Sequence, residues 1–127
     1  MPPLPISASL QDYLESILNL SRSGEPVRVT DIAVRLNLAK ASVTQALGVL
    51  QDQGLVDHQR YGPVTLTEQG HQVALTVQRR HEVILNFLIE VLKVDPKNAE
   101  RDACLMEHAV STETMEKLVR FLELYKQ

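Results

Sequence analysis

Three residues with metal-ligating side chains stand close together in the last quarter of the sequence. Cys104, Glu107 and His108 occupy positions i, i+3 and i+4, so in a helix they project from one face. A thiolate, a carboxylate and an imidazole on one face are suitable donors for a divalent cation. A histidine or glutamate of an amphipathic helix is more often packed or solvated than ligating, so each residue alone leaves both interpretations open.

Further donor side chains stand on two other predicted helices. Asp12 and Glu15 are three residues apart in the first helical segment, and His81 lies within the longest one. Carboxylates at this spacing share a helix face and are commonly surface charges. Together with the cysteine group, however, they predict one metal pocket that is lined by three helices. His58 and His71 have no comparable neighbours, and we interpret them as structural.

The elements of the N-terminal half have the order of a winged helix-turn-helix. Apolar residues at helical spacing predict a first helix that is capped by Ser9 and a second that is capped by Thr30. A third helix follows a turn at Asn37, and residues 54–67 contain two runs of strand-forming residues around a polar turn. In such a domain the helix after the turn enters the DNA major groove.

Polar and basic side chains are placed where a winged domain meets double-stranded DNA. Short polar side chains at the start of the third helix suit base edges or phosphates, and the wing tip suits the adjacent backbone or minor groove. The predicted DNA-binding residues are Arg28, Lys40, Ser42, Thr44, Gln45, Arg60 and Tyr61. The alternatives are a three-helix core with a solvated hairpin, and a winged module that binds only protein.

The C-terminal half is predicted to be helical. Residues 68–92 form one long pattern without proline that is apolar on more than one side. A stop at residues 94–96 separates it from two further helices, one near residues 98–110 and one from Ser111 to about residue 124, with Ser111 and Thr114 as capping oxygens.

The fold class is therefore mainly α. We predict a winged helix-turn-helix DNA-binding domain over residues 1–70 and a helical metal-binding and dimerisation domain over residues 71–127. A chain of 127 residues is long enough for two small units of this kind.

Composition and the chain start bear on compartment and charge. No apolar run approaches the roughly 20 residues that cross a bilayer. The opening MPPLPIS lacks the regions of a signal peptide, so we interpret it as a short extended arm. We therefore expect a cytoplasmic protein without a membrane partner. The single cysteine excludes an internal disulfide. The net charge of −3 is unusual for a DNA-binding protein, but basic residues gather between positions 22 and 60 and acidic ones from Asp95 onward.

Several segments resemble the diphtheria-toxin-repressor family of iron- and manganese-dependent regulators, especially its shorter manganese transport regulator branch. The segments are LQDYLESILNL, VTDIAVRLNLAKASVTQALGVLQDQGLV with its wing exit GPVTLTEQG, RRHEVILNFL, and DACLMEHAVS. The resemblance covers nearly the whole length. It implies a winged domain, a helical dimerisation domain, and a divalent metal between them that orders the homodimer for operator binding. The length suggests the two-domain type, without the SH3-like third domain of the longer iron regulators.

The resemblance also implies a ligand set. Its members are Asp12, Glu15, His81, Cys104, Glu107 and His108. Asp12 and Glu15 match carboxylate ligands of the manganese branch, whereas Cys104 matches the cysteine of the iron branch and replaces a bridging glutamate of the manganese branch. Glu100 and Leu85 stand where the iron branch has a histidine and a glutamate, so that branch's ancillary site is not intact here. Whether Glu100 is a ligand stays open.

These observations predict a metal-dependent DNA-binding transcriptional regulator, a repressor of metal-uptake genes that responds to Mn²⁺ or Fe²⁺. The thiolate adds affinity for Co²⁺ or Zn²⁺ in vitro. The expected partners are a second copy of the chain and operator DNA with a pseudo-palindromic sequence, because a two-fold pair reads two half-sites. The alternative is a metal-independent winged-helix regulator that senses oxidants through Cys104 or binds a small molecule. A metalloenzyme is disfavoured, because nothing in the sequence indicates an open coordination position with a substrate cleft.

Overall fold

The structure is a computed structural model that describes residues 6–125. Contacts within the chain divide these residues into two compact units, which we call the N-terminal unit (residues 6–75) and the C-terminal unit (residues 76–125). Most of the predicted N-terminal arm, residues 1–5, lies outside the described residues. Within the described range, no helix combines the length and the apolar character that a membrane crossing requires.

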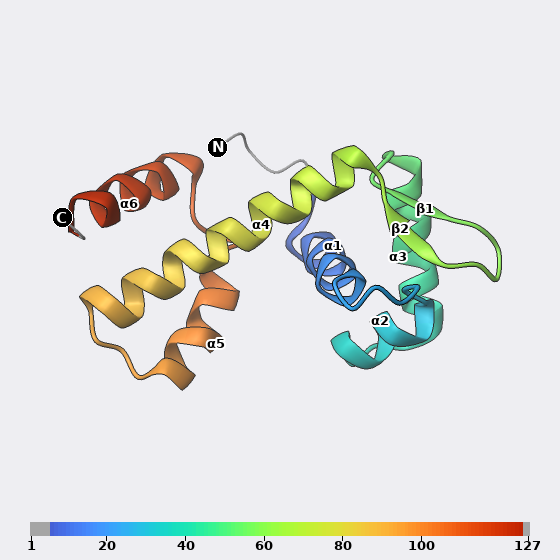
Figure 1. The fold of residues 1–127 in the computed structure, drawn as a ribbon, viewed down its shortest axis with the longest axis horizontal. Helices are drawn as coiled ribbons and strands as arrows, with labels where there is room; N and C mark the ends of the chain where they lie inside the picture. Colours follow the sequence, from blue (N-terminus) through green and yellow to red (C-terminus); the bar gives the residue numbers. More distant parts are fainter. Residues whose placement is uncertain (1–5, 126–127) are drawn as a thin grey trace. The chain divides into compact units, whose positions relative to one another are not determined.

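Three helices form the body of the N-terminal unit (Figure 1). They are α1 (Ala8–Ser21), α2 (Val29–Leu36) and α3 (Lys40–Asp52). The turn between α2 and α3 is built on Asn37, whose backbone is left-handed at φ 56° and ψ 50°. Leu38 donates its N–H to the carbonyl of Ala33 at 3.0 Å, which satisfies a carbonyl at the end of α2. The turn predicted at Asn37 is therefore present.

Two helix starts differ from their predicted positions. The N-cap of α1 is Ser7 rather than Ser9, and its Oγ accepts a backbone N–H of the first turn at 3.3 Å. The second helix begins one residue before Thr30, because the carboxylate of Asp31 accepts the N–H of Arg28 at 3.0 Å. In both cases a second capping oxygen lies within two residues of the predicted one, and helical spacing does not distinguish between them.

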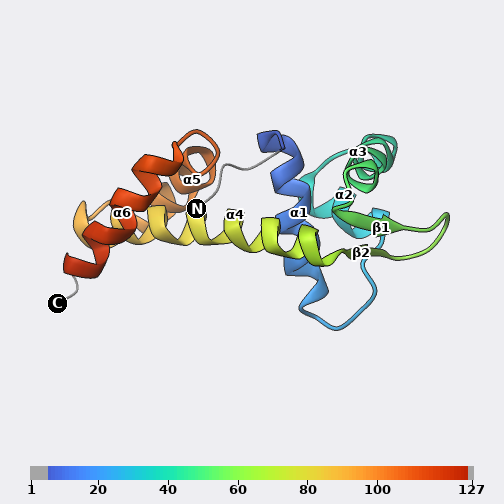
Figure 2. The ribbon, with the colours of Figure 1, turned by 90° about the horizontal axis from the view of Figure 1, so that it is seen from above.

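A two-stranded wing completes the N-terminal unit. Strands β1 (Val56–His58) and β2 (Val64–Leu66) are antiparallel, and Val27 forms an isolated bridge to Val64, whose N–H donates to the Val27 carbonyl at 2.7 Å. The loop between the strands projects beyond the three helices in both views (Figures 1 and 2). The predicted wing is therefore present.

One apolar core holds this unit together. Its fully buried side chains include Leu14, Ile17, Ile32, Val43, Leu47, Leu50, Leu55, Val56 and Val64. They come from α1, α2, α3, the wing and the segment between them, so each element contributes at least one side chain. Burial of each such side chain stabilises the fold by about 1.5–3 kcal/mol relative to exposure.

The first turn of α4 (Glu68–Asn86) is fixed to this core by backbone contact. Thr67 Oγ1 accepts the N–H of Gly70 at 3.0 Å and donates to the carbonyl of Gly54 at 2.7 Å. A Cβ added to Gly70 would lie 1.8 Å from the carbonyl oxygen of Leu55. Only glycine fits at this position without a shift of the backbone.

The C-terminal unit consists of helices that pack around the second half of α4 (Figures 1 and 2). The further elements are η1 (Phe87–Val91), α5 (Pro96–Met106) and α6 (Thr112–Tyr125). The long helix predicted over residues 68–92 is present, but its last turn is a π-helix, in which Leu92 donates to the carbonyl of Phe87 at 3.2 Å. The apolar core of the C-terminal unit contains Val83, Ile84, Leu88, Ala99, Ala103, Met115 and Leu122.

The helix α5 differs from its prediction at both ends. Pro96 lies inside its first turn, where a missing N–H costs nothing, and Asp95 caps it by accepting the N–H of Lys97 at 3.1 Å. The helix ends at Met106, and residues 107–110 form a turn. The predicted capping oxygen of Ser111 is confirmed, because it accepts the N–H of Thr114 at 3.2 Å ahead of α6.

Candidate functional site

The end of α5 distributes three predicted ligands over helix and turn. Cys104 lies on the helix, Glu107 is its C-cap, and His108 follows in the turn. The helix thus ends before His108, although Glu107 keeps a right-handed helical backbone, and the shared face of the three side chains stays a prediction. Cys104 is exposed, whereas Glu107 is buried with an exposed fraction of 1%.

His81 on α4 is the centre of a cluster of donor side chains. Its Nε2 lies 2.8 Å from Glu100 Oε1, and its Nδ1 lies 3.2 Å from Glu107 Oε2. The second carboxylate oxygen of Glu107 lies 3.3 Å from His108 Nε2. One imidazole thus faces a carboxylate on each of its two nitrogens, and the cluster joins α4, α5 and the following turn.

Two donor atoms of this cluster are buried without a hydrogen bond. Within residues 6–125, neither His81 Nδ1 nor Glu107 Oε2 has a partner in hydrogen-bond geometry, although the two atoms face each other. Their separation of 3.2 Å is that of an ion pair, which compensates both atoms as long as His81 is protonated. Once the ring loses its proton, the nitrogen and the oxygen direct lone pairs to the same place, which fits a divalent cation.

The charge of His81 depends on the same neighbours. The carboxylate of Glu107 raises the pKa of His81 to about 9, and Glu100 adds to this rise, while burial acts in the opposite direction. In the absence of metal, His81 is therefore an imidazolium near neutral pH. A metal ion that uses this ring as a ligand must displace its proton.

The thiol of Cys104 adds a softer donor beside His81 and Glu100. One ligand atom from each of His81, Glu100 and Cys104 lies within 4.8 Å of the others. The set of nitrogen, oxygen and sulfur suits first-row divalent ions, and the thiolate favours the softer of them. The structure thus brings Glu100, which sequence reasoning left open, into the donor cluster.

Two predicted ligands lie in the other unit. Asp12 and Glu15 are half-buried residues of α1, three positions apart and on one side of that helix. Their participation in a shared site stays a prediction.

A groove of about 670 Å³ runs between α3 and the wing in the N-terminal unit. Five of the seven predicted DNA-binding residues line it, namely Arg28, Lys40, Thr44, Arg60 and Tyr61. Ser42 and Gln45 are exposed on α3 but do not line it. His58 does line the groove, although its sequence context suggested a structural role. His58 lies on the same face of β1 as the buried Val56, which by itself indicates packing, so strand alternation did not point to the groove.

The wing tip presents an ordered aromatic and basic pair. Tyr61 has an exposed fraction of 87% and a left-handed backbone at φ 61°. The guanidinium of Arg60 lies 5.3 Å from the centre of the tyrosine ring, within the range of a cation–π contact. A tight turn holds them, because Gly62 donates to the carbonyl of Gln59 at 2.8 Å.

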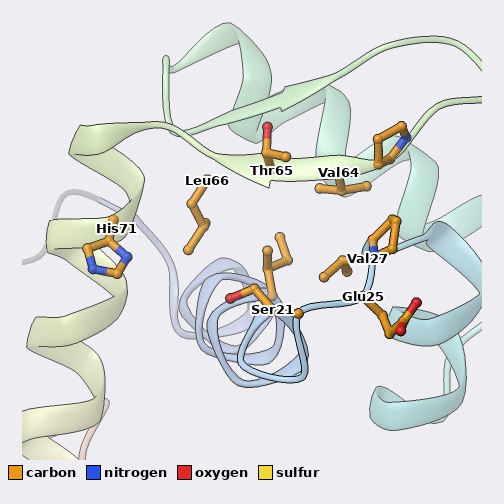
Figure 3. A pocket seen from close by; sticks show the side chains of 11 residues that line it. Ser21, Glu25, Val27, Val64, Thr65, Leu66 and His71 are labelled. Carbon is orange, nitrogen blue, oxygen red and sulfur yellow. The ribbon is translucent and has the colours of Figure 1, made fainter.

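The N-terminal unit contains another cavity of about 490 Å³, between β2, the end of α1 and the first turns of α4 (Figure 3). Leu66 points from β2 toward Ser21, and His71 lies on α4 at the edge (Figure 3). Among the described residues, the predicted metal ligands and DNA-binding side chains do not line this cavity. For the alternative of a metal-independent regulator that binds a small molecule, this cavity is the site at which ligand binding would be tested.

Comparison with known families assigns both halves of the chain. Residues 6–64 match the N-terminal DNA-binding domain of iron-dependent repressors, and residues 67–127 match the metal-binding and dimerisation domain of the same proteins. The chain belongs to the iron-dependent repressor family. This confirms the resemblance to diphtheria-toxin-repressor regulators and the mainly α fold with a winged DNA-binding domain.

Relatives within this family cover most of the chain. The HTH-type transcriptional regulator MJ0568 of Methanocaldococcus jannaschii is 38% identical over 122 residues, which are 95% of this chain and 98% of that protein. The transcriptional regulator MntR of Escherichia coli O6:H1 is 38% identical over 107 residues, covering 84% of this chain and 68% of MntR. A solved manganese-dependent transcriptional repressor in complex with manganese aligns with a TM-score of 0.83 and 33% identity, over 90% of this chain and 52% of its own. The chain thus spans about half the length of that solved protein.

Membership in the iron-dependent repressor family fixes the general activity. The protein is a metal-dependent transcriptional regulator and not an enzyme, as the sequence predicted. Its family domains imply DNA and a second copy of the chain as partners. The His81 cluster falls within the residues matched by the metal-binding domain, and the groove of α3 and the wing falls within those matched by the DNA-binding domain.

Proposed function

We propose that this regulator represses metal-uptake genes in the cytoplasm when Mn²⁺ or Fe²⁺ occupies the cluster around His81. The observation that carries the proposal is the convergence of two buried donor atoms, His81 Nδ1 and Glu107 Oε2, which lie 3.2 Å apart. The similarity to a solved manganese-dependent transcriptional repressor supports Mn²⁺ as one of the two candidates.

The proposed ligands are those implied by the family resemblance. They are Asp12, Glu15, His81, Cys104, Glu107 and His108. The distances among His81, Glu107 and His108 support a common site for these three, and the contact of Glu100 with His81 supports it as an additional oxygen donor. Cys104 supplies a thiolate, which favours Co²⁺ or Zn²⁺ in vitro relative to a site made only of oxygen and nitrogen.

The proposed DNA contacts come from α3, the start of α2 and the wing. They are Arg28, Lys40, Ser42, Thr44, Gln45, Arg60 and Tyr61. The groove that five of them line supports this assignment. Because two-fold related subunits read two half-sites about one DNA turn apart, we expect a pseudo-palindromic operator. We place the boundary between the DNA-binding and metal-binding domains at residues 70 and 71.

The proposed dimer surface includes the exposed face of α6. Phe121, Leu124 and Tyr125 have exposed fractions of 45%, 65% and 51%, and the Phe121 ring stacks on Tyr125 with centroids 5.9 Å apart. Large apolar side chains that remain exposed together on one helix are typical of a surface covered by a partner.

Metal couples to DNA binding through the ligands of α1. In this proposal, Asp12 and Glu15 tie α1 to the metal held by α4 and α5, so metal selects one spacing of the two recognition helices in the dimer. A ligand shifts such an equilibrium only by its differential affinity for the two states, and couplings of about 1–3 kcal/mol are typical. Metal should therefore raise operator affinity by about 5- to 150-fold.

Replacement of one histidine tests the proposal. We expect His81→Ala to abolish the stimulation of operator binding by Mn²⁺, because it removes the ring that faces both carboxylates. The matched control is His71→Ala, since His71 lies on the same helix and is exposed outside the cluster. Unchanged stimulation in His81→Ala would refute the assignment. Operator binding that is equally strong in chelator would favour the metal-independent alternative.

A further inference from the structure

A buried arginine precedes the central histidine of the cluster. Arg80 has an exposed fraction of only 5%, whereas its neighbour Arg79 is exposed. Arginine stays protonated under all ordinary conditions, so its charge is buried with it. Burial of a charge is costly unless hydrogen bonds compensate it, and such residues have a specific partner.

The partners of Arg80 lie in the turn that carries the predicted ligands. Its Nη1 donates to the carbonyl of Glu107 at 3.3 Å and to that of Val110 at 3.0 Å, and its Nη2 donates to Thr112 Oγ1 at 3.4 Å. These acceptors lie 27 to 32 residues farther along the chain. The last carbonyls of a helix have no partner within the helix, and Arg80 supplies one to the end of α5.

Two adjacent residues of α4 therefore hold Glu107 at its two ends. Arg80 binds the backbone carbonyl of Glu107, and His81 faces its carboxylate at 3.2 Å. The same contacts fix the backbone of His108, because the carbonyls on both sides of it, at Glu107 and Val110, accept from one guanidinium nitrogen. The guanidinium therefore links this turn to α4, in addition to the backbone hydrogen bonds that Ala109 and Val110 donate to the carbonyl of Met106.

We propose that Arg80 is a positioning residue of the metal site, which sets the affinity and coordination geometry through Glu107 and His108 without touching the metal. This inference rests on the proposed function, because it presupposes a metal at these ligands. Groups that orient metal ligands typically change metal affinity by about 10- to 100-fold when they are removed. The planar fork of two donor nitrogens is specific to arginine, so lysine cannot replace it.

The test is Co²⁺ titration of the full-length, metal-stripped protein, followed by visible absorption, which reports coordination geometry as well as affinity. We expect Arg80→Lys and Arg80→Gln to weaken Co²⁺ binding by about 10- to 100-fold and to alter the absorption spectrum. The matched control, Arg79→Gln, removes the same charge one residue away and should change neither. Thermal unfolding of the metal-free variants is measured alongside.

Each outcome decides a separate point. Arg80 variants that lose thermal stability but keep the wild-type affinity and spectrum would overturn the inference, since the arginine would then be only structural. If both Arg80 variants fail to fold, Thr112→Val decides, because it removes one acceptor and leaves every predicted ligand in place. Its expected loss is about 2- to 10-fold, the equivalent of one hydrogen bond, with unchanged affinity and spectrum overturning the inference. Failure of the wild-type protein to bind Co²⁺ or Mn²⁺ would instead refute the proposed function.

Discussion

Metal affinity should rise steeply with pH because His81 must lose a proton to bind. In the metal-free protein the carboxylate of Glu107 raises the pKa of His81 to about 9. An imidazolium has no lone pair to donate, so the raised pKa opposes metal binding below pH 9 and has no effect above it. The sign is therefore fixed: binding strengthens as pH increases and levels off near the pKa.

The size of the effect on metal affinity follows from the difference between the pKa of His81 and the pH of the experiment. At pH 7, about two units below the pKa, roughly one molecule in a hundred carries the neutral ring, so this proton alone lowers the apparent affinity about 100-fold. The logarithm of the association constant should rise by about one for each pH unit between about pH 6.5 and 8.5 because of this single proton.

Competition titrations with Mn²⁺ at several pH values measure this slope. His81→Gln separates the contribution of this ring from that of the other ligands, because glutamine does not titrate in this range. We expect the wild-type slope to exceed that of the variant by about one proton per metal ion. Equal slopes for the two proteins would refute the reasoning, since His81 would then bind metal without releasing a proton or would not bind it at all.

Three further substitutions test the fold, the DNA contact and the choice of metal. In urea unfolding, Gly70→Ala should lower the free energy of unfolding by about 2 kcal/mol or more, because the added Cβ would lie 1.8 Å from the Leu55 oxygen. The control Gly48→Ala has open space at its Cβ and should raise the free energy of unfolding by up to about 1 kcal/mol. Equal effects of the two substitutions would argue against the close packing at Gly70. Lys40→Ala should weaken binding to all DNA sequences and lower the slope of log affinity against log salt by about 1, and an unchanged slope would remove Lys40 from the phosphate contacts. Cys104→Ser should reduce the affinity for Zn²⁺ more than that for Mn²⁺ in the same titration, and a parallel loss for both ions would contradict a thiolate ligand.

The architecture of the N-terminal unit was predictable because its signals are local. The left-handed turn at Asn37 and the two strand-forming runs of residues 54–67 each follow from residues within a few positions of one another. The errors at the helix starts have the same origin. Where two capping oxygens compete within two residues, local preference does not select between them.

The candidate site was predictable only in part, because its geometry depends on packing between distant segments. The contact of His81 with Glu100 joins positions that are 19 residues apart, and it forms only once α5 packs on α4. The helix α5 ends at Met106, so Glu107 and His108 lie on its C-cap and in the following turn, and the sequence contains no glycine or proline there to indicate this end.

Arg80 shows a signal that the sequence did contain. It stands three residues after Val77 and four before Ile84, both of which are buried, so helical periodicity places it on the apolar face of α4. Arg79 lies about 100° away around the helix and is exposed. A charged residue in phase with an apolar stripe therefore indicates a buried partner, although the identity of that partner required the structure.

The central claim is that metal controls DNA recognition. The direct test uses metal-stripped, full-length protein and a DNA duplex selected from random sequences by the Mn²⁺-loaded form, with operator affinity measured as Mn²⁺ is added and then removed by chelator. We predict an increase of about 5- to 150-fold on addition of metal and its reversal by chelator. An affinity that is the same with Mn²⁺, with Fe²⁺ and in chelator would contradict it.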